Sequence, residues 1–182
     1  MNVGGASHYK NAHHLITQLA MVWHPLHWFT GFMSLVFFIR GGIKLAKAGK
    51  MSQGTDPARV VLYTWGAAAF FGAISFWINS LSNTLFNEQI NSNPINRAPA
   101  INGQVFGPDM HAAFALMYII GFITMIRAGF EFHSAGYGGK GSMPKAWAHL
   151  FGGVCLLNLP KLIAILLATV GLNLSSFSGV IH

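Results

Sequence analysis

Charged side chains are scarce in this chain of 182 residues, and acidic ones are the scarcest. Only 8% of the residues are charged, with 4 Asp or Glu against 11 Lys or Arg, while 53% are hydrophobic. A soluble domain carries about 25% charged residues. The composition therefore excludes an ordinary soluble domain and indicates a chain that lies in a membrane.

Two kinds of site lack the residues that they need. The chain has one cysteine, Cys155, which excludes an internal disulfide bond. Four of its nine histidines lie in the predicted transmembrane helices: His24, His27, His111 and His149. Asp109 is the only carboxylate near them in the sequence. This scarcity of acids disfavours a zinc hydrolase and a proton relay.

Long uncharged runs are what the chain does have. A helix needs about 20 residues to cross a hydrocarbon core of about 30 Å, and unpaired backbone groups are not tolerated there. Four stretches are free of acidic and basic residues apart from Lys161: 11–39, 60–87, 110–126 and 146–182. The predicted fold class is therefore an all-α membrane protein with four transmembrane helices, at about 18–39, 58–80, 110–128 and 146–170.

The chain also contains an internal repeat. Residues 39–66 recur without a gap 87 positions later, at 126–153, with 8 identities in 28 positions. Each copy is a basic connector between two apolar runs, so the chain is predicted to be two tandem copies of one helical hairpin. The predicted parts are an N-terminal arm, two hairpins joined by an Asn- and Pro-rich loop, and a tail: 1–14, 15–85, 86–109, 110–172 and 173–182.

Most of the basic residues lie in the two short connectors. Cytoplasmic loops of membrane proteins carry an excess of Lys and Arg, so both connectors are predicted to face the cytoplasm. Both termini and the loop at 86–109 then face outward. The connector residues predicted to contact lipid or a partner are Arg40, Lys44, Lys47, Arg127, Lys140 and Lys145.

Both connectors also carry signals for helix ends. Asp56 before Pro57, and Ser142 before Pro144, place a side-chain oxygen where a helix N-terminus needs a cap. Gly49 and Gly136 are expected to end the helices that precede them.

The second apolar run carries a face of small residues. Small residues let helix backbones approach closely in lipid, where the hydrophobic effect does not drive association. The residues predicted to serve helix packing are Gly66, Ala69, Gly72 and Ala73. This packing takes place either within the chain or against a neighbouring copy.

Histidine pairs raise the alternative of a haem or copper site. Two haem ligands must lie at one depth on facing helices, and His24 and His111 occupy similar places in the two hairpins. Histidines at helix ends also hydrogen-bond loops, which is the competing interpretation. Apart from this alternative, no cofactor is predicted except a bound phospholipid.

Lys161 follows Asn158 and Pro160 inside the last apolar run. A lysine deep in a membrane is costly and marks a functional site, unless it snorkels to the surface. The predicted partners of Lys161 and Asn158 are a lipid phosphate, an acid of a neighbouring copy, and carbonyls that the proline leaves free.

The architecture carries a resemblance to a known group of proteins. Four spans, outward termini, basic cytoplasmic connectors and the turns Ile39-Arg40-Gly41-Gly42 and Ile126-Arg127-Ala128-Gly129 resemble small inner-membrane proteins of type IVB secretion and conjugation systems, the Dot/Icm group and its IncI-plasmid transfer counterparts. Each hairpin is also similar in layout to a conjugative pilin, although a pilin has one hairpin and a cleavable leader.

The resemblance implies a subunit of an envelope machine, not an enzyme, and it supplies no catalytic residue. Its implied partners are copies of itself, other membrane subunits of the machine, and transferred DNA or protein. The alternative function is a small membrane carrier or cytochrome-like protein that uses His24, His111 and Lys161.

Overall fold

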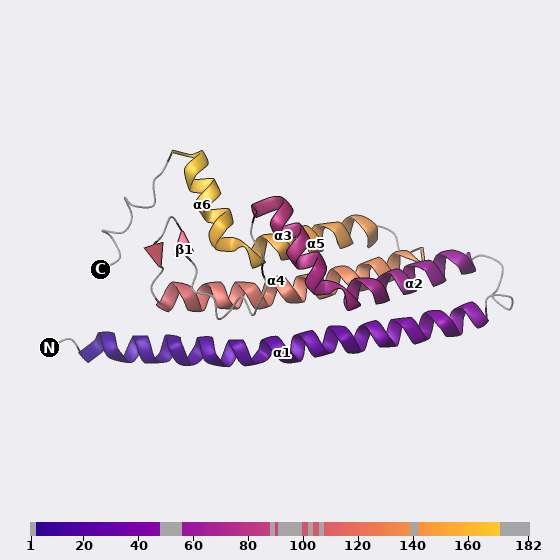
Figure 1. Cartoon of the computed structure of the whole chain (residues 1–182), viewed down its shortest axis with the longest axis horizontal. Helices are drawn as coiled ribbons and strands as arrows, with labels where there is room; N and C mark the ends of the chain where they lie inside the picture. Colours follow the sequence, from indigo (N-terminus) through magenta and orange to yellow (C-terminus); the bar gives the residue numbers. More distant parts are fainter. Residues whose placement is uncertain are drawn as a thin grey trace.

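The computed structural model describes residues 3–47, 56–87, 90, 100–101, 104–105, 108–138 and 142–171. These residues form six helices and one short pair of strands (Figure 1): α1 (Val3–Ala46), α2 (Pro57–Gly72), α3 (Ile74–Phe86), β1 (Ala100–Ile101), β2 (Gln104–Val105), α4 (Pro108–Ala135), α5 (Ser142–Leu157) and α6 (Leu159–Thr169). The two strands pair antiparallel. The helical character predicted from the sequence is confirmed.

Two of these helices are long and apolar enough to cross a membrane. They are α1 over His13–Ala46 and α4 over Met110–Ala135. Two further candidates are bent pairs, α2 with α3 and α5 with α6, and they raise the number to four if each pair counts as one span. Helices of this length and composition indicate an integral membrane protein.

Helix α1 is much longer than a single crossing requires. Its 44 residues correspond to about 66 Å of helix, roughly twice the thickness of a hydrocarbon core. The predicted N-terminal arm, 1–14, is helical from Val3 onward. Pro25 removes one backbone hydrogen bond from the interior of α1, yet the helix continues through it.

The predicted spans at 58–80 and 146–170 are not single helices. The second run bends by 75° after Gly72, and the fourth bends by 85° after Leu157. Pro160 explains the second bend because it has no N–H and its ring crowds the preceding turn. The first bend follows Gly72, a poor helix former, and Ala73 leaves helical geometry there with φ −109° and ψ 22°.

The repeat is visible in the order of elements. Each half has a long helix, then a helix of 16 residues, then a sharp bend into a shorter helix. At the start of α2 the predicted cap is confirmed, because the Asp56 side chain accepts a hydrogen bond of 3.0 Å from the Ala58 amide. Gly136 follows the last residue of α4 as predicted, whereas Gly49 lies outside the described residues.

Contacts between rings show that α1 and α4 run in the same direction. Trp23 packs on Phe122 at 4.8 Å, and Phe37 packs on His133 at 4.6 Å, so both helices advance together. Figure 1 shows the two helices side by side, with the C-terminal ends of both at the right. The two predicted basic connectors therefore follow helix ends at one end of the bundle, which is called the basic end below.

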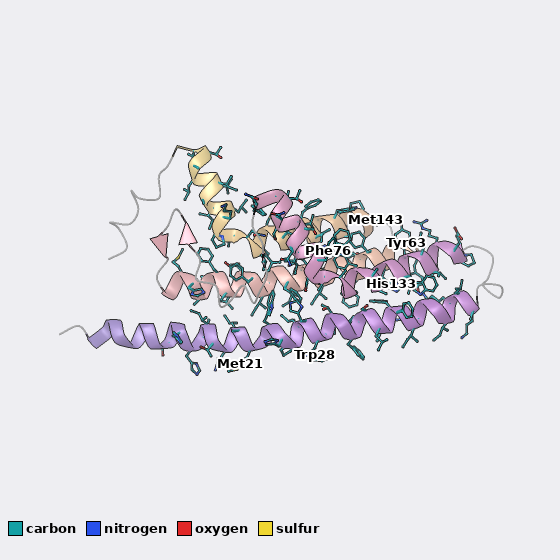
Figure 2. All side chains as sticks on the ribbon, viewed as in Figure 1. Met21, Trp28, Tyr63, Phe76, His133 and Met143 are labelled. Carbon is teal, nitrogen blue, oxygen red and sulfur yellow. The ribbon has the colours of Figure 1, made fainter. Side chains whose placement is uncertain are left out.

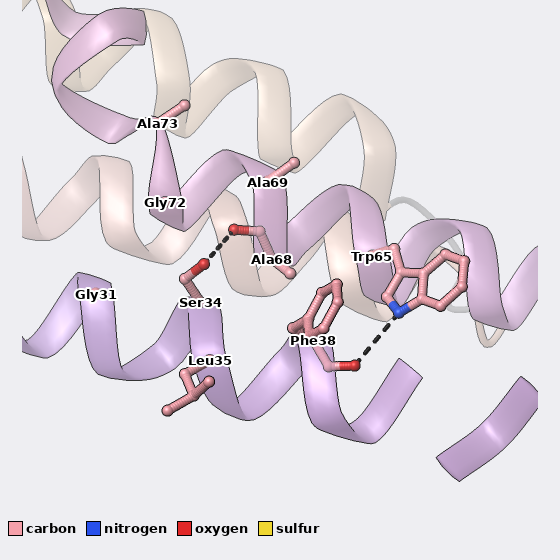
Figure 3. Close-up of a pocket in the computed structure, with 9 residues that line it drawn as sticks. All are labelled: Gly31, Ser34, Leu35, Phe38, Trp65, Ala68, Ala69, Gly72 and Ala73. Atoms are coloured by element: carbon pink, nitrogen blue, oxygen red, sulfur yellow. Dashed lines mark hydrogen bonds between the residues drawn. The ribbon is translucent and has the colours of Figure 1, made fainter. Parts of the chain in front are cut away.

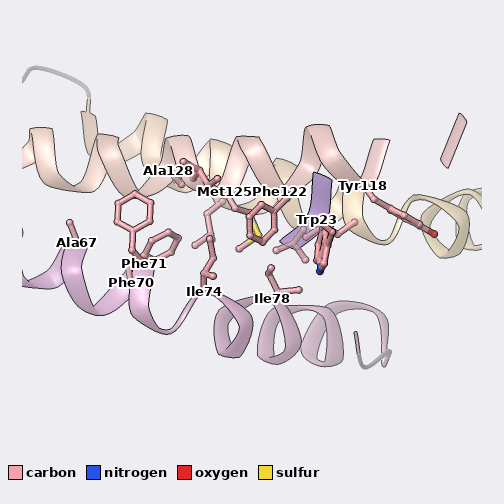
Figure 4. Packing of buried hydrophobic residues seen from close by; sticks show 14 of the residues in the cluster. Trp23, Ala67, Phe70, Phe71, Ile74, Ile78, Tyr118, Phe122, Met125 and Ala128 are labelled. Atoms are coloured by element: carbon pink, nitrogen blue, oxygen red, sulfur yellow. The ribbon is translucent and has the colours of Figure 1, made fainter. Parts of the chain in front are cut away.

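The core lies where α4 meets the other long helices (Figure 4). Phe71 is 1% exposed, and Phe122 and Met125 are fully buried. Phe37 stacks on Phe71 at 5.5 Å, and so joins α1 to α2. Half of the apolar window of α4 is buried, against 17% for α1. Helix α4 is thus the central helix, and α1 presents most of its surface outward.

Candidate functional site

A shallow groove of about 600 Å³, the α1/α2 groove, lies between α1 and α2 (Figure 3). Helix α1 contributes one wall and α2, with the residue after it, the other. Its lining residues are Gly31, Ser34, Leu35, Phe38, Trp65, Ala68, Ala69, Gly72 and Ala73. These side chains are small or apolar, so the groove suits an apolar chain or another helix rather than a polar ligand.

Two hydrogen bonds hold the walls of the groove together. The Ser34 hydroxyl donates to the Ala68 carbonyl at 2.8 Å, and the Trp65 indole N–H donates to the Phe38 carbonyl at 3.3 Å. A β-carbon at Gly72 would lie 2.9 Å from the Ser34 hydroxyl. Gly72 therefore gives Ser34 the room to reach the backbone of α2.

The predicted small-residue face divides into two parts. Gly66, Ala69 and Gly72 are all exposed, but only Gly72 lies directly against a side chain of α1, Ser34. A β-carbon added at Gly66 would meet no atom within 4 Å. Ala73 lies at the bend between α2 and α3. Within the chain, only Gly72 of these four permits a close approach of helices that its β-carbon would block.

A second hollow of about 500 Å³ continues the α1/α2 groove along α1. It shares Gly31 and Leu35 with the groove and extends to His24. Large apolar side chains surround both hollows. Trp28 is 80% exposed and Met21 67% exposed, and Figure 2 shows both on the side of α1 away from the other helices. The outer face of α1 is thus a continuous apolar surface.

The structure does not bring His24 and His111 together. His24 lies beside Trp23, whose ring packs on Phe122 of α4. Phe122 is eleven residues beyond His111, about 16 Å along the helix axis. The two histidines therefore lie at different levels, which does not suit a shared haem. His27, not His24, turns toward α4 and packs on Phe122 at 4.8 Å.

The predicted contact residues at the basic end lie on several helices. Arg40, Lys47, Arg127 and Lys145 are exposed, and Lys140 lies outside the described residues. Lys44 instead turns inward, where its ammonium lies 3.9 Å from the centre of the Tyr137 ring. Arg59 donates to the carbonyl of Ala135 at 3.3 Å and ties the start of α2 to the end of α4.

Asn158 joins the two bent pairs. Its side-chain amide donates to the Ser82 hydroxyl on α3 at 2.8 Å and to the Val154 carbonyl on α5 at 2.9 Å. Asn158 is 5% exposed and Ser82 fully buried. Lys161 lies after the bend, on the exposed surface of α6. Asn158 is thus a structural link between the two bent pairs.

Several residues of these sites had no clear sequence signal. Gly121 and Gly153 mark a close approach of α4 and α5, since a β-carbon on either would lie 2.8 Å from the carbonyl oxygen of the other. The repeat contains Gly153 but gives no reason for it. Ser82, His133 and Tyr137 have partners far away in the sequence, and no local pattern identifies such residues.

No group of three or more His, Cys, Asp or Glu that would hold a metal ion occurs in the described part of the chain. Comparisons with protein families, with curated proteins and with solved structures found no match to this chain. The features that bear on function are therefore the groove, the basic end and the membrane helices themselves.

Proposed function

We propose that this chain is a structural subunit that associates with copies of itself in a membrane. The observation that carries the proposal is the α1/α2 groove, which lies open beside α1, the less buried of the two long apolar helices. A neighbouring helix would fill this groove. Self-association would also cover the apolar outer face of α1 in part, and lipid tails would cover the rest.

The glycines support this proposal. A glycine inside a helix costs about 1 kcal/mol relative to alanine. Gly31 lies in the groove, and Gly66 on the exposed surface of α2, and a β-carbon on either would meet no atom within 4 Å. The single chain therefore gains no close contact from them. A second helix would gain one, because small residues let backbones approach in lipid.

The setting that we propose is the inner membrane of a bacterium, in an apparatus that transfers DNA or protein across the cell envelope. It is supported by the resemblance of the four-span layout and the basic connectors to type IVB secretion and conjugation proteins. Other membrane subunits of the apparatus would then be partners.

The proposal is tested by the size of the detergent-extracted particle. A β-carbon at Gly31 meets no atom within 4 Å, and Gly31→Leu places a large side chain in the groove, so we expect the protein to fold and to lose its higher-order particle. Light scattering coupled to gel filtration measures the change. Gly152→Leu is the matched control, because Gly152 on α5 is equally open but lies away from the groove. A single-chain particle in the unmodified protein would refute self-association.

The proposed setting needs a separate measurement. Host cells that carry only the Gly31→Leu chain should transfer DNA or protein much less efficiently than cells with the unmodified chain or with Gly152→Leu. Normal transfer by cells that lack the chain altogether would refute a role in the transfer apparatus. Self-association would still be tested by the particle size.

A further inference from the structure

Side chains from α1, from the end of α4 and from the turn after α4 meet at the basic end. Lys44 of α1 lies over the ring of Tyr137, which follows α4, at 3.9 Å. His133 lies one turn before Tyr137 and meets its ring edge-on at 5.2 Å. The other face of His133 packs near Phe37 at 4.6 Å. We call Arg40, Lys44, His133 and Tyr137 the basic cluster, since Arg40 lies one turn before Lys44 on α1.

Two polar atoms of this cluster lack a partner. In the described part of the chain, Lys44 Nζ and His133 Nδ1 are the buried side-chain nitrogen or oxygen atoms without a hydrogen bond. Buried polar groups in proteins are nearly always hydrogen-bonded. The Tyr137 ring attracts the ammonium but accepts none of its hydrogen bonds in the way an oxygen does. Two adjacent unsatisfied groups on different helices thus indicate a missing hydrogen-bonding partner.

The charges of the cluster favour an anionic partner. Arg40 and Lys44 carry two positive charges, and no described acid forms an ion pair with either of them. Asp56 is engaged at the start of α2, where it caps the helix. Phosphate and carboxylate oxygens accept hydrogen bonds from Lys and Arg in the short, strong form typical of charged pairs.

The position of the cluster favours phosphate over carboxylate. Aromatic residues that mark the boundary between hydrocarbon and headgroups gather at this end of the bundle. Trp65 is 37% exposed, Trp147 45% and Tyr137 48%. Phospholipid phosphates lie at this level of a membrane. The half-exposed Tyr137 ring puts the cluster at the protein surface, and the flexible lysine stem lets the ammonium turn from the ring toward a headgroup.

We propose that the basic cluster is a binding site for the phosphate of an anionic phospholipid. Lys44 and Arg40 hold the phosphate oxygens by charged hydrogen bonds, and His133 donates from Nδ1 in the tautomer that carries its proton there. Tyr137 is the platform that positions Lys44. The site links α1 to α4, and none of its residues lines the α1/α2 groove.

The test uses the full chain in detergent, with phosphatidylglycerol as the probe and native mass spectrometry to count bound lipid. We expect the double variant Arg40→Gln, Lys44→Gln to bind phosphatidylglycerol about tenfold more weakly, the loss expected for removing hydrogen bonds to a charged group. Lys44→Arg keeps the charge and should restore most of the binding. Phosphatidylcholine, which has no net charge, should bind weakly to every form.

The matched control removes the same charge from the same end of the bundle. Arg127→Gln with Lys145→Gln takes away two exposed cations outside the cluster, and it should weaken binding about threefold or less. Equal losses in the two double variants would overturn the site in favour of diffuse attraction. Unchanged lipid binding with a smaller particle would overturn it in favour of a partner's carboxylate.

A measurement on the unmodified protein keeps the test independent of variant folding. With ¹⁵N-labelled lysine and phosphatidylglycerol bilayers, solid-state NMR should show a dipolar contact between lipid phosphorus and one lysine ammonium. That contact should disappear in Lys44→Arg, which identifies the lysine. A spectrum without such a contact would overturn the proposal whatever the particle size, so its failure is distinct from a failure of self-association.

Discussion

At the scale of single residues, glycines have two different roles in this chain. Gly121 and Gly153 face each other across α4 and α5, where either β-carbon would lie 2.8 Å from the opposite carbonyl oxygen. Gly152 is the residue before Gly153 on α5, yet a β-carbon there would meet nothing within 4 Å. Glycine is thus required by close packing at one position and is free of any such requirement at its neighbour.

This contrast predicts that a change of glycine to valine destabilises the protein at Gly153 and has little effect at Gly152. Gly153→Val drives a branched side chain into the backbone of α4 and should lower the free energy of unfolding by about 1–3 kcal/mol, the usual cost of overpacking. Thermal unfolding in detergent, followed by tryptophan fluorescence, measures the loss. Gly152→Val should shift the midpoint little, since it has open space around it. Similar midpoints for both variants would contradict the α4–α5 contact.

At the scale of elements, the sequence predicts the helices better than their bends. Uncharged runs identify the helical segments, because a membrane requires apolar side chains and internal hydrogen bonds. The uncharged runs do not show where a helix axis changes direction, so they predict neither bend. Pro160 marks one bend, but Gly72 and Ala73 look like an ordinary small-residue face. The basic cluster is likewise hidden, because Lys44 and Tyr137 are far apart in the chain and meet only after α1 and α4 have packed.

The bend before α6 should depend on its proline. Pro160→Ala restores a backbone N–H and removes the ring that crowds the preceding turn, so α5 and α6 should straighten in part. Ala148 and Ala168 lie ten residues on either side of Asn158. The backbones at these two positions should be separated by about 22 Å through space at the 85° bend and by about 30 Å in a straight helix. Spin labels attached there report this separation. A pulsed electron paramagnetic resonance experiment measures this distance.

Asn158 supplies the control for that experiment. Its hydrogen bond to Ser82 also holds the bend, by tying it to α3. Ser82→Ala removes that bond while the proline remains. If Ser82→Ala lengthens the distance as much as Pro160→Ala does, packing against α3 sets the bend and the proline is not its main cause.

At the scale of the whole molecule, the parallel order of α1 and α4 constrains the path of the chain. Both helices run toward the basic end, as the successive contacts of Trp23 with Phe122 and of Lys44 with Tyr137 show. The chain must therefore return to the opposite end between them. We expect helices α2 and α3 to provide that return, so that the bent pair acts as one crossing even though its helices meet at 75°.

Cysteine labelling in sealed membrane vesicles tests this path of the chain. With Cys155 replaced by serine, Lys47→Cys and Tyr137→Cys should react from one side of the membrane, since both lie at the basic end. Asn87→Cys, at the end of α3, should react only from the other side. We expect the first side to be the cytoplasm, because cytoplasmic loops carry an excess of cations. Labelling of Asn87→Cys from the same side as Lys47→Cys would make α2 and α3 a re-entrant loop. Because α1 and α4 run in the same direction, the return crossing would then have to lie between Asn87 and α4.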